Sequence, residues 1–285
     1  MKKAIMTTVL GLVLVVSPTA AFAQNSTTDD ISQKQKFQVV YEKAKADYDK
    51  NHPKRKAATK TYPHAYEMLD AKYQNVILEK VMAYEKANPT ASEDEVNDYF
   101  VQLEKTYNSN NKELISLNEE MNLTSESSNP FYEYIGGKAQ LNDLEEGLFE
   151  AHPVDGLKAL TAAQEATDWT VYKFGYNGHN DKSDAFRHSA WNIWIIGFTS
   201  DSTWAANWTN AHELGAVGQP QAEYDMDMQN NSIGRLYAFL NGIDENSSVT
   251  ATRNTTVDSY TSGSLWRIVS GSNQYFTGST SDFIN

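Results

Sequence analysis

Apolar residues recur at three- and four-residue intervals through most of the chain, a spacing typical of amphipathic helices. Over residues 31–123 this spacing predicts a charged helical hairpin or three-helix unit, in which one helix runs from His64 to Ala87. Ser92 followed by Glu95 matches a capping box and predicts the start of a further helix, which we expect to break at residues 108–111. We interpret the many charges of this unit mainly as a solvated face, with partner binding as the alternative.

The helical pattern resumes beyond residues 124–130, a stretch rich in Ser and Asn that is typical of a linker. Residues 131–245 predict a helical-bundle domain, and its expected helices are 138–151, 153–172, 182–197, 203–214 and 223–240. Residues 246–285 are rich in Ser and Thr with short apolar runs, which predicts a few strands or an irregular segment. The predicted fold class is therefore mainly α, with a short β or irregular C-terminal segment.

The amino end has the pattern of a secretory signal peptide. Lys2 and Lys3 precede the apolar run Ile5 to Val16, and Ala21-Phe22-Ala23 is a small-x-small cleavage pattern. We therefore expect residues 1–23 to be removed on export and residues 24–30 to form a disordered lead-in; the alternative is an uncleaved anchor. The expected location is extracellular, with association with the cell envelope left open. We expect no membrane span after signal removal, because no later apolar stretch is long enough.

The composition excludes several classes of function. The chain of 285 residues has 24 Lys and Arg against 37 Asp and Glu, a formal net charge of −13. This charge argues against nucleic-acid binding, which needs basic residues to displace counterions from phosphates. The absence of Cys excludes disulfides, thiolate metal ligands and a cysteine nucleophile. There is also no Gly-x-Ser-x-Gly elbow, phosphate-binding loop, dinucleotide fingerprint or His-Glu-x-x-His zinc motif, so we expect no nucleotide cofactor.

Candidate chemistry concentrates in the second half of the chain. Asp184 and His188 are four residues apart, so a helix places both on one face. Trp191 and Ile195 continue that face, which indicates that the polar pair is at least partly buried and needs polar partners. The spacing suits two ligands of one metal, or a carboxylate that orients an imidazole; a structural Asp–His pair is the alternative.

Two later segments offer groups of the same kind. His212 and Glu213 are adjacent, so in a helix they point about 100° apart and take different roles, one in direct contact with the site and the other supporting it or moving a proton. Asp227, Asn231 and Arg235 form a polar stripe at four-residue spacing, which serves either a site or cross-bracing of helices. Polar stripes on separate helices meet when they face one shared interior, as in the metal sites of helical bundles.

These segments also carry a resemblance. The order Asp-Ala-Phe-Arg-His with Trp-Asn, then Ala-His-Glu, then Met-Asp-Met-Gln-Asn-Asn with Gly-Arg resembles a domain of uncharacterised, often exported bacterial proteins. The resemblance covers residues 131–242 and implies one shared site, but it implies no reaction.

The hypothesis that follows is a secreted hydrolase with a His/carboxylate site, metal-dependent or of a metal-free His–Asp type, acting on an envelope or lipid-like substrate that bears phosphate or carboxylate. Zinc and calcium are the candidate metals. The alternatives are a non-catalytic exported protein that binds the envelope or a partner and has a structural polar cluster, and a secreted effector or toxin. The candidate catalytic residues are His188, Asp184, Glu213 and Arg235; the candidate substrate-binding residues are Arg187, Asn231 and Asn230; and the candidate metal ligands are Asp184, His188, His212 and Asp227.

Overall fold

The computed structural model describes residues 28–52, 58–118, 131–132, 134–135 and 138–285. The predicted signal peptide and the predicted linker, residues 124–130, lie outside these residues. Contacts divide the chain into two units, residues 1–40 and 41–285. Of the first unit, the structure describes residues 28–40 as the start of α1, so this helix begins within the stretch predicted as a lead-in.

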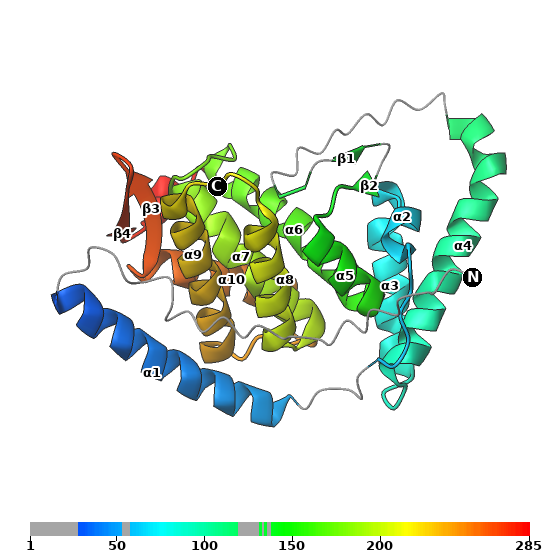
Figure 1. Ribbon diagram of the computed structural model, residues 1–285, viewed down its shortest axis with the longest axis horizontal. Helices are drawn as coiled ribbons and strands as arrows, with labels where there is room; N and C mark the ends of the chain where they lie inside the picture. Colours follow the sequence, from blue (N-terminus) through cyan, green and yellow to red (C-terminus); the bar gives the residue numbers. More distant parts are fainter. Residues whose placement is uncertain (1–27, 53–57, 119–130, 133, 136–137) are drawn as a thin grey trace, which may run out of the picture. The chain divides into compact units, whose positions relative to one another are not determined.

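Among the described residues the protein is mainly helical, as predicted, and its strands are short (Figure 1). In chain order the elements are α1 (Thr28–Asn51), α2 (Ala65–Met68), α3 (Ala71–Ala87), α4 (Glu93–Asn118), β1 (Tyr134–Ile135), β2 (Lys138–Ala139), α5 (Asp143–Ala151), α6 (Pro153–Phe174), α7 (Lys182–Thr199), α8 (Ser202–Gly215), α9 (Gln221–Leu240), α10 (Val249–Thr261), β3 (Leu265–Val269), β4 (Ser272–Phe276) and a short 3-10 turn, Thr280–Asp282.

The region before the bundle differs from prediction at two helices. The single helix expected from His64 to Ala87 is divided into α2 and α3, because the side chain of Asp70 accepts a hydrogen bond from Lys72 N and caps a new helix. α4 continues through residues 108–111 without the expected break, since Asn costs only a few tenths of a kcal/mol in a helix. The Ser92–Glu95 capping box forms as the sequence indicates.

α7 is the central helix of the bundle, and α6, α8, α9 and α10 pack around it. Asp181 starts α7 by accepting hydrogen bonds from Ser183 N and Asp184 N. α9 approaches α7 closely at Gly234, where an added Cβ would lie 2.3 Å from the carbonyl oxygen of Ser189. A larger residue there would force α7 and α9 apart. The Gly of the Gly-Arg motif therefore sets the spacing of the two helices that carry the candidate site.

The structure also differs from prediction at the two ends of the bundle domain. The helix expected from residue 138 begins only at Asp143, because β1 pairs with β2 and Asn142 caps α5 in a capping box with Glu145. Part of the Ser/Thr-rich C-terminal segment forms the helix α10, capped by Ser248, and the buried hydroxyls of Thr256 and Ser259 donate to backbone carbonyls within the helix. The predicted short C-terminal β structure is the antiparallel β3–β4 hairpin. None of the helices described is long and apolar enough to cross a membrane.

Candidate metal centre

Two polar stripes face each other where α7 and α9 pack together. α7 contributes Asp184, His188 and Asn192, and α9 contributes Asp227, Asn231 and Arg235, in both cases at four-residue spacing. The stripes meet in chain order, because His188 lies beside Asp227, Asn192 bonds to Asn231, and Arg235 bonds to Asn192. All six residues are buried. The polar stripe predicted from the sequence of α9 therefore faces inward along its whole length.

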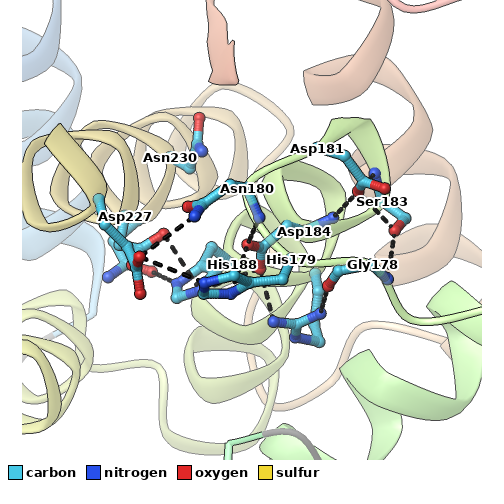
Figure 2. A network of polar contacts seen from close by, with 12 residues as sticks. Gly178, His179, Asn180, Asp181, Ser183, Asp184, His188, Asp227 and Asn230 are labelled. Atoms are coloured by element: carbon cyan, nitrogen blue, oxygen red, sulfur yellow. Dashed lines mark hydrogen bonds and ion pairs between the residues drawn. The ribbon is translucent and has the colours of Figure 1, made fainter. Parts of the chain in front are cut away.

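The outer end of these stripes brings three potential metal ligands together (Figure 2). His188 Nε2 lies 3.5 Å from Asp184 Oδ1 and 3.3 Å from Asp227 Oδ1. One ligand atom from each of the three residues lies within 4.8 Å of the other two, and no other described residues form such a group. Asp184, His188 and Asp227 are therefore placed to bind one ion, which includes three of the four ligands predicted from the sequence.

The opposite nitrogen of His188 is held by a second set of acceptors. His188 Nδ1 lies 3.3 Å from Asn231 Oδ1 and 3.4 Å from Glu213 Oε1. Asn231 Nδ2 donates to Glu213 at 3.0 Å, and Asn192 Nδ2 donates to Asn231 Oδ1 at 2.8 Å. A proton on Nδ1 therefore has acceptors, and Nε2 is directed at the two aspartates. A carboxylate behind an imidazole in this way is the usual support of a histidine metal ligand.

Asp184 is fixed by groups from the start of its own helix. Its Oδ1 accepts from Arg187 at 2.5 Å, and its Oδ2 accepts from the backbone N–H of Asn180 at 2.5 Å. Arg187 also donates to the carbonyl oxygen of Gly178 at 3.2 Å, and its guanidinium lies 4.9 Å from the ring centre of Phe131. Arg187 thus positions Asp184. The guanidinium N–H groups that do so are the ones that would otherwise bind an anionic substrate.

Asp227 is less completely satisfied. Its Oδ2 accepts a hydrogen bond from Gln219 Nε2 at 2.8 Å. Its Oδ1, which faces His188, is buried and accepts no hydrogen bond. Because this oxygen has the His188 ring beside it at 3.3 Å but accepts no hydrogen bond, it can still accept a positively charged ligand.

The buried charges shift each other's protonation. Burial alone would lower the pKa of His188, but Asp227, Asp184 and Glu213 raise it well above its ordinary value. Burial raises the pKa of Asp184, but Arg187 and His188 reverse this and lower it to about 2. Burial next to other carboxylates raises the pKa of Asp227 well above its usual range. Burial also opposes ionisation of Glu213, but the adjacent His188 lowers its pKa overall. Without a cation, this cluster retains protons that a metal ion would displace.

The three ligands lie at a pocket of about 400 Å³. His179 and Glu223 form part of its wall, with His179 Nε2 3.2 Å from Glu223 Oε2; the His179 side chain is 70% exposed and its Nδ1 lies 3.8 Å from Asp184 Oδ2. The loop between α8 and α9, residues 216–220, forms another part. The ligands are thus buried but open to a space that can admit a small group.

His212 also lines this pocket, although it does not join the ligand group. Its Nδ1 lies 2.8 Å from Oε1 of Glu145, a buried carboxylate that also accepts from the hydroxyl of Tyr132 at 2.7 Å. The geometry therefore does not place His212 with the other predicted metal ligands. The two adjacent residues divide as expected: Glu213 points to His188, and His212 points to Glu145.

Two further candidate residues lie away from the pocket. Arg235 donates to Asn192 Oδ1 at 2.7 Å and to the hydroxyls of Ser232 and Tyr41 at 3.0 and 3.2 Å, so its guanidinium is used inside the bundle. Asn230 exchanges two hydrogen bonds with the backbone of Trp266 and fastens β3 to α9. The structure therefore does not bring Arg235 or Asn230 to the pocket, and the catalytic role of Arg235 and the substrate-binding role of Asn230 stay predictions from the sequence.

Some residues of the site were not identified from the sequence. Asn192 continues the spacing of Asp184 and His188 by four residues, a signal that was present in the Trp-Asn motif. Glu145 and Gln219 reach the site from other elements, and Glu145 resembles an ordinary capping-box residue in the sequence. Only the fold places these two side chains at the site.

Comparison with known proteins supports one part of the resemblance seen in the sequence, namely that the domain is uncharacterised. Residues 146–260 match a family model described as a domain of unknown function, DUF6973. This segment is less than half of the 285-residue chain, but it contains all three potential ligands and Glu213. No curated protein and no solved structure matches the chain.

Proposed function

We propose that this protein is a metal-dependent hydrolase in which Asp184, His188 and Asp227 hold one divalent ion. The observation that carries the proposal is the arrangement around His188. One nitrogen faces Glu213 and Asn231, and the other faces two buried carboxylates. One of those carboxylates has an oxygen without a hydrogen-bond partner.

The charge balance of the cluster supports a cation. Asp184, Asp227 and Glu213 are each at most 4% exposed, and Arg187 is the guanidinium beside them. Three ionised carboxylates would exceed one guanidinium even when His188 carries a second positive charge, and without a cation the raised pKa of Asp227 keeps that carboxyl protonated instead. Excess charge of one sign is unfavourable in a buried site, so binding of a divalent ion would relieve it.

The chemistry of the ligands favours a transition metal. Imidazole nitrogen combined with carboxylate oxygen suits Zn²⁺ and metals of similar preference. Ca²⁺ and Mg²⁺ prefer sites made of oxygen alone, so the presence of His188 argues against them. Three protein ligands also leave a coordination position for water or substrate, which is typical of catalytic rather than structural zinc sites.

A divalent ion bound there would polarise a substrate oxygen and lower the pKa of a coordinated water. The residues of the chain supply the other requirements. Glu213 and Asn231 hold the His188 ring so that Nε2 faces the ligand position, and Arg187 holds Asp184. Glu145 holds the Nδ1 side of His212, so the proposed tautomer carries its proton on Nδ1. The other ring nitrogen is then free to accept or donate a proton at the pocket.

The proposed substrate is an envelope or lipid-like molecule with a phosphate or carboxylate group. Glu213, Glu223, Asp184 and Asp227 line the pocket and would repel such an anion in the absence of the ion. Binding of the substrate would therefore depend on the metal. The proposal includes export, which is supported by the signal-peptide pattern of residues 1–23.

A second candidate is a non-catalytic exported protein, and one observation favours it. Hydrogen bonds run without interruption from Asn231 through Asn192 to Arg235, as in a purely structural network. This alternative predicts that the outer cluster also serves stability alone and binds no metal.

The test is metal content and hydrolysis by the full chain and two matched variants. Asp227→Asn keeps the shape of the side chain but replaces a carboxylate ligand, and Asp225→Asn is the control on the same helix, since Asp225 is partly exposed and bonds to Gln221. We expect one equivalent of metal in the unaltered protein and in the control, and none in Asp227→Asn after dialysis.

Hydrolysis of p-nitrophenyl phosphate, bis(p-nitrophenyl) phosphate and p-nitrophenyl acetate is then compared in the three proteins with added Zn²⁺ and with added Ca²⁺. Metal-dependent turnover that Asp227→Asn loses and Asp225→Asn retains supports the proposal. Absence of bound metal in the unaltered protein, with Asp227→Asn less stable than Asp225→Asn, would support the structural alternative instead.

A further inference from the structure

A second pocket lies within the unit of residues 41–285, between α4, α6 and α8, and the metal ligands do not line it. Its volume is about 430 Å³. Asn97 of α4, Asp155 and Lys158 of α6, and Trp204 of α8 are among the residues that line it. None of these residues serves the metal centre, so this pocket requires an explanation of its own.

Asn97 contributes a hydrogen-bond donor without an acceptor. Its side chain is completely buried, and its Oδ1 accepts from Val154 N at 3.3 Å. Its Nδ2 has no partner. A buried donor of this kind costs free energy unless a ligand or an ordered water supplies an acceptor.

Asp155 contributes a carboxylate to the same pocket, and it follows Val154, whose backbone N–H donates to Asn97. Its side chain is 28% exposed, and its Oδ1 lies 3.7 Å from Lys158 Nζ, beyond hydrogen-bond distance. Lys158 instead donates to Glu85 at 2.9 Å. Burial, together with nearby Glu85 and Glu93, raises the pKa of Asp155 to about 6 despite Lys158. The Lys158 ammonium is thus within ion-pair distance of this carboxylate but too far away for a hydrogen bond, so the carboxylate can accept a hydrogen bond from a ligand.

The rest of the wall indicates what kind of cation would fit. The described residues contain no group of three metal-ligating side chains here, which argues against a metal ion. Trp204 forms part of the wall and packs edge-on against His152, with ring centres 5.3 Å apart. An aromatic wall suits the carbon skeleton of an organic ammonium ion better than a hydrated metal.

We infer that this pocket binds a small organic ammonium that carries a carbonyl oxygen next to it, the α-amino amide group found in amino-acid amides and at peptide amino termini. The ammonium pairs with Asp155, and the carbonyl oxygen accepts the hydrogen bond from Asn97 Nδ2. This site is separate from the proposed hydrolase centre and does not depend on it.

The test compares the binding of L-alaninamide and of two analogues to the full chain, and titration calorimetry measures each affinity. Propanamide lacks the ammonium, and sec-butylamine has an ethyl group in place of the carboxamide. We expect L-alaninamide to bind about tenfold more tightly than either analogue, because each analogue loses one hydrogen bond that involves a buried or charged group. No binding of L-alaninamide up to its solubility limit overturns the inference, as does equal affinity for either analogue.

Two variants assign the contact. Asp155→Asn should weaken L-alaninamide about tenfold and leave propanamide unchanged, since only the ammonium is affected. Glu245→Gln is the control, because Glu245 lines the same pocket from the loop before α10. Equal weakening by both variants would show a general effect of charge and contradict the assigned contact. If Asp155→Asn fails to fold, the comparison of the three probes on the unaltered protein still decides.

Discussion

The two ends of the polar stripes on α7 and α9 have the same kind of residues but differ in how those residues are satisfied. At the inner end, Asn192 and Arg235 bond to each other and to hydroxyl groups, and none of the described carboxylates bonds to either of them. At the outer end, the carboxylates of Asp184 and Asp227 lie on either side of His188 at a pocket, and one carboxylate oxygen accepts no hydrogen bond. Both ends are buried.

This difference separates a structural network from a binding site. Buried polar groups that satisfy each other fix the packing of two helices and need nothing further. A buried carboxylate next to a pocket that lacks a hydrogen bond is fully satisfied only when a cationic ligand binds in the pocket. The inner end therefore should matter for folding, and the outer end for ligand binding. This contrast can be tested end by end.

The largest expected effect is on stability, at the inner end. Arg235→Met should lower the free energy of unfolding by about 3 kcal/mol, since it leaves several buried acceptors without their donor. Metal content should stay at that of the unaltered protein. Urea unfolding with metal analysis measures both, and Arg253→Met is the control, because Arg253 of α10 is partly exposed and stacks on Trp169. Loss of metal in Arg235→Met would show that the two ends act as one unit.

The next effect concerns removal of the ion from the outer end. With free metal at about 100 times its dissociation constant, binding adds about 2.7 kcal/mol to the stability of the folded state. Excess chelator should therefore lower the melting temperature of the unaltered protein and of Arg235→Met, but not that of Asp227→Asn. A chelator effect of the same size in Asp227→Asn would place the ion elsewhere.

The stripes themselves are the part of the site that the sequence predicts. Four-residue spacing places Asp184 with His188, and Asp227 with Asn231 and Arg235, on single helix faces, and both faces are buried as expected. The sequence does not show which end of a stripe reaches a pocket, because this depends on how α8 and the loop before α9 pack. The spacing therefore predicts a catalytic role for Arg235 as readily as for His188, although Arg235 bonds inside the bundle and does not line the pocket.

Side chains that come from distant elements were the hardest to predict. Glu145 lies 67 positions from His212 along the chain, and its capping-box pattern already accounts for it locally. Similarly, the Ser and Thr residues of α10 favour strands or turns in isolation, and contacts with α7 and α9 favour the helix. Local spacing thus predicts helix faces, while tertiary packing decides which residues meet.

A smaller effect is expected behind the metal ligands. Glu213→Gln should weaken metal binding about tenfold, because a neutral amide supports the His188 ring less well than a carboxylate does. Glu223→Gln is the matched control, since Glu223 lines the same pocket but contacts His179 and Asn180 rather than His188. Competition with a chromogenic chelator measures both affinities. Equal weakening would mean that the total charge of the pocket, and not support of His188, determines the affinity.

The smallest expected effect concerns His212, which lines the pocket but belongs to neither stripe. Burial would lower the pKa of His212, but Glu145 raises it above its ordinary value. A histidine with a raised pKa stabilises the folded state fully below its unfolded pKa, near 6.5, and this contribution is lost as pH rises through the folded value. Glu145→Gln should therefore remove about 1 kcal/mol of stability at pH 5.5 that is absent at high pH. Urea unfolding at both pH values measures the difference, with Glu146→Gln on the same helix as the control. A loss of stability that does not change with pH would mean that Glu145 acts through Tyr132 and the start of α5, and that His212 is neutral at all these pH values.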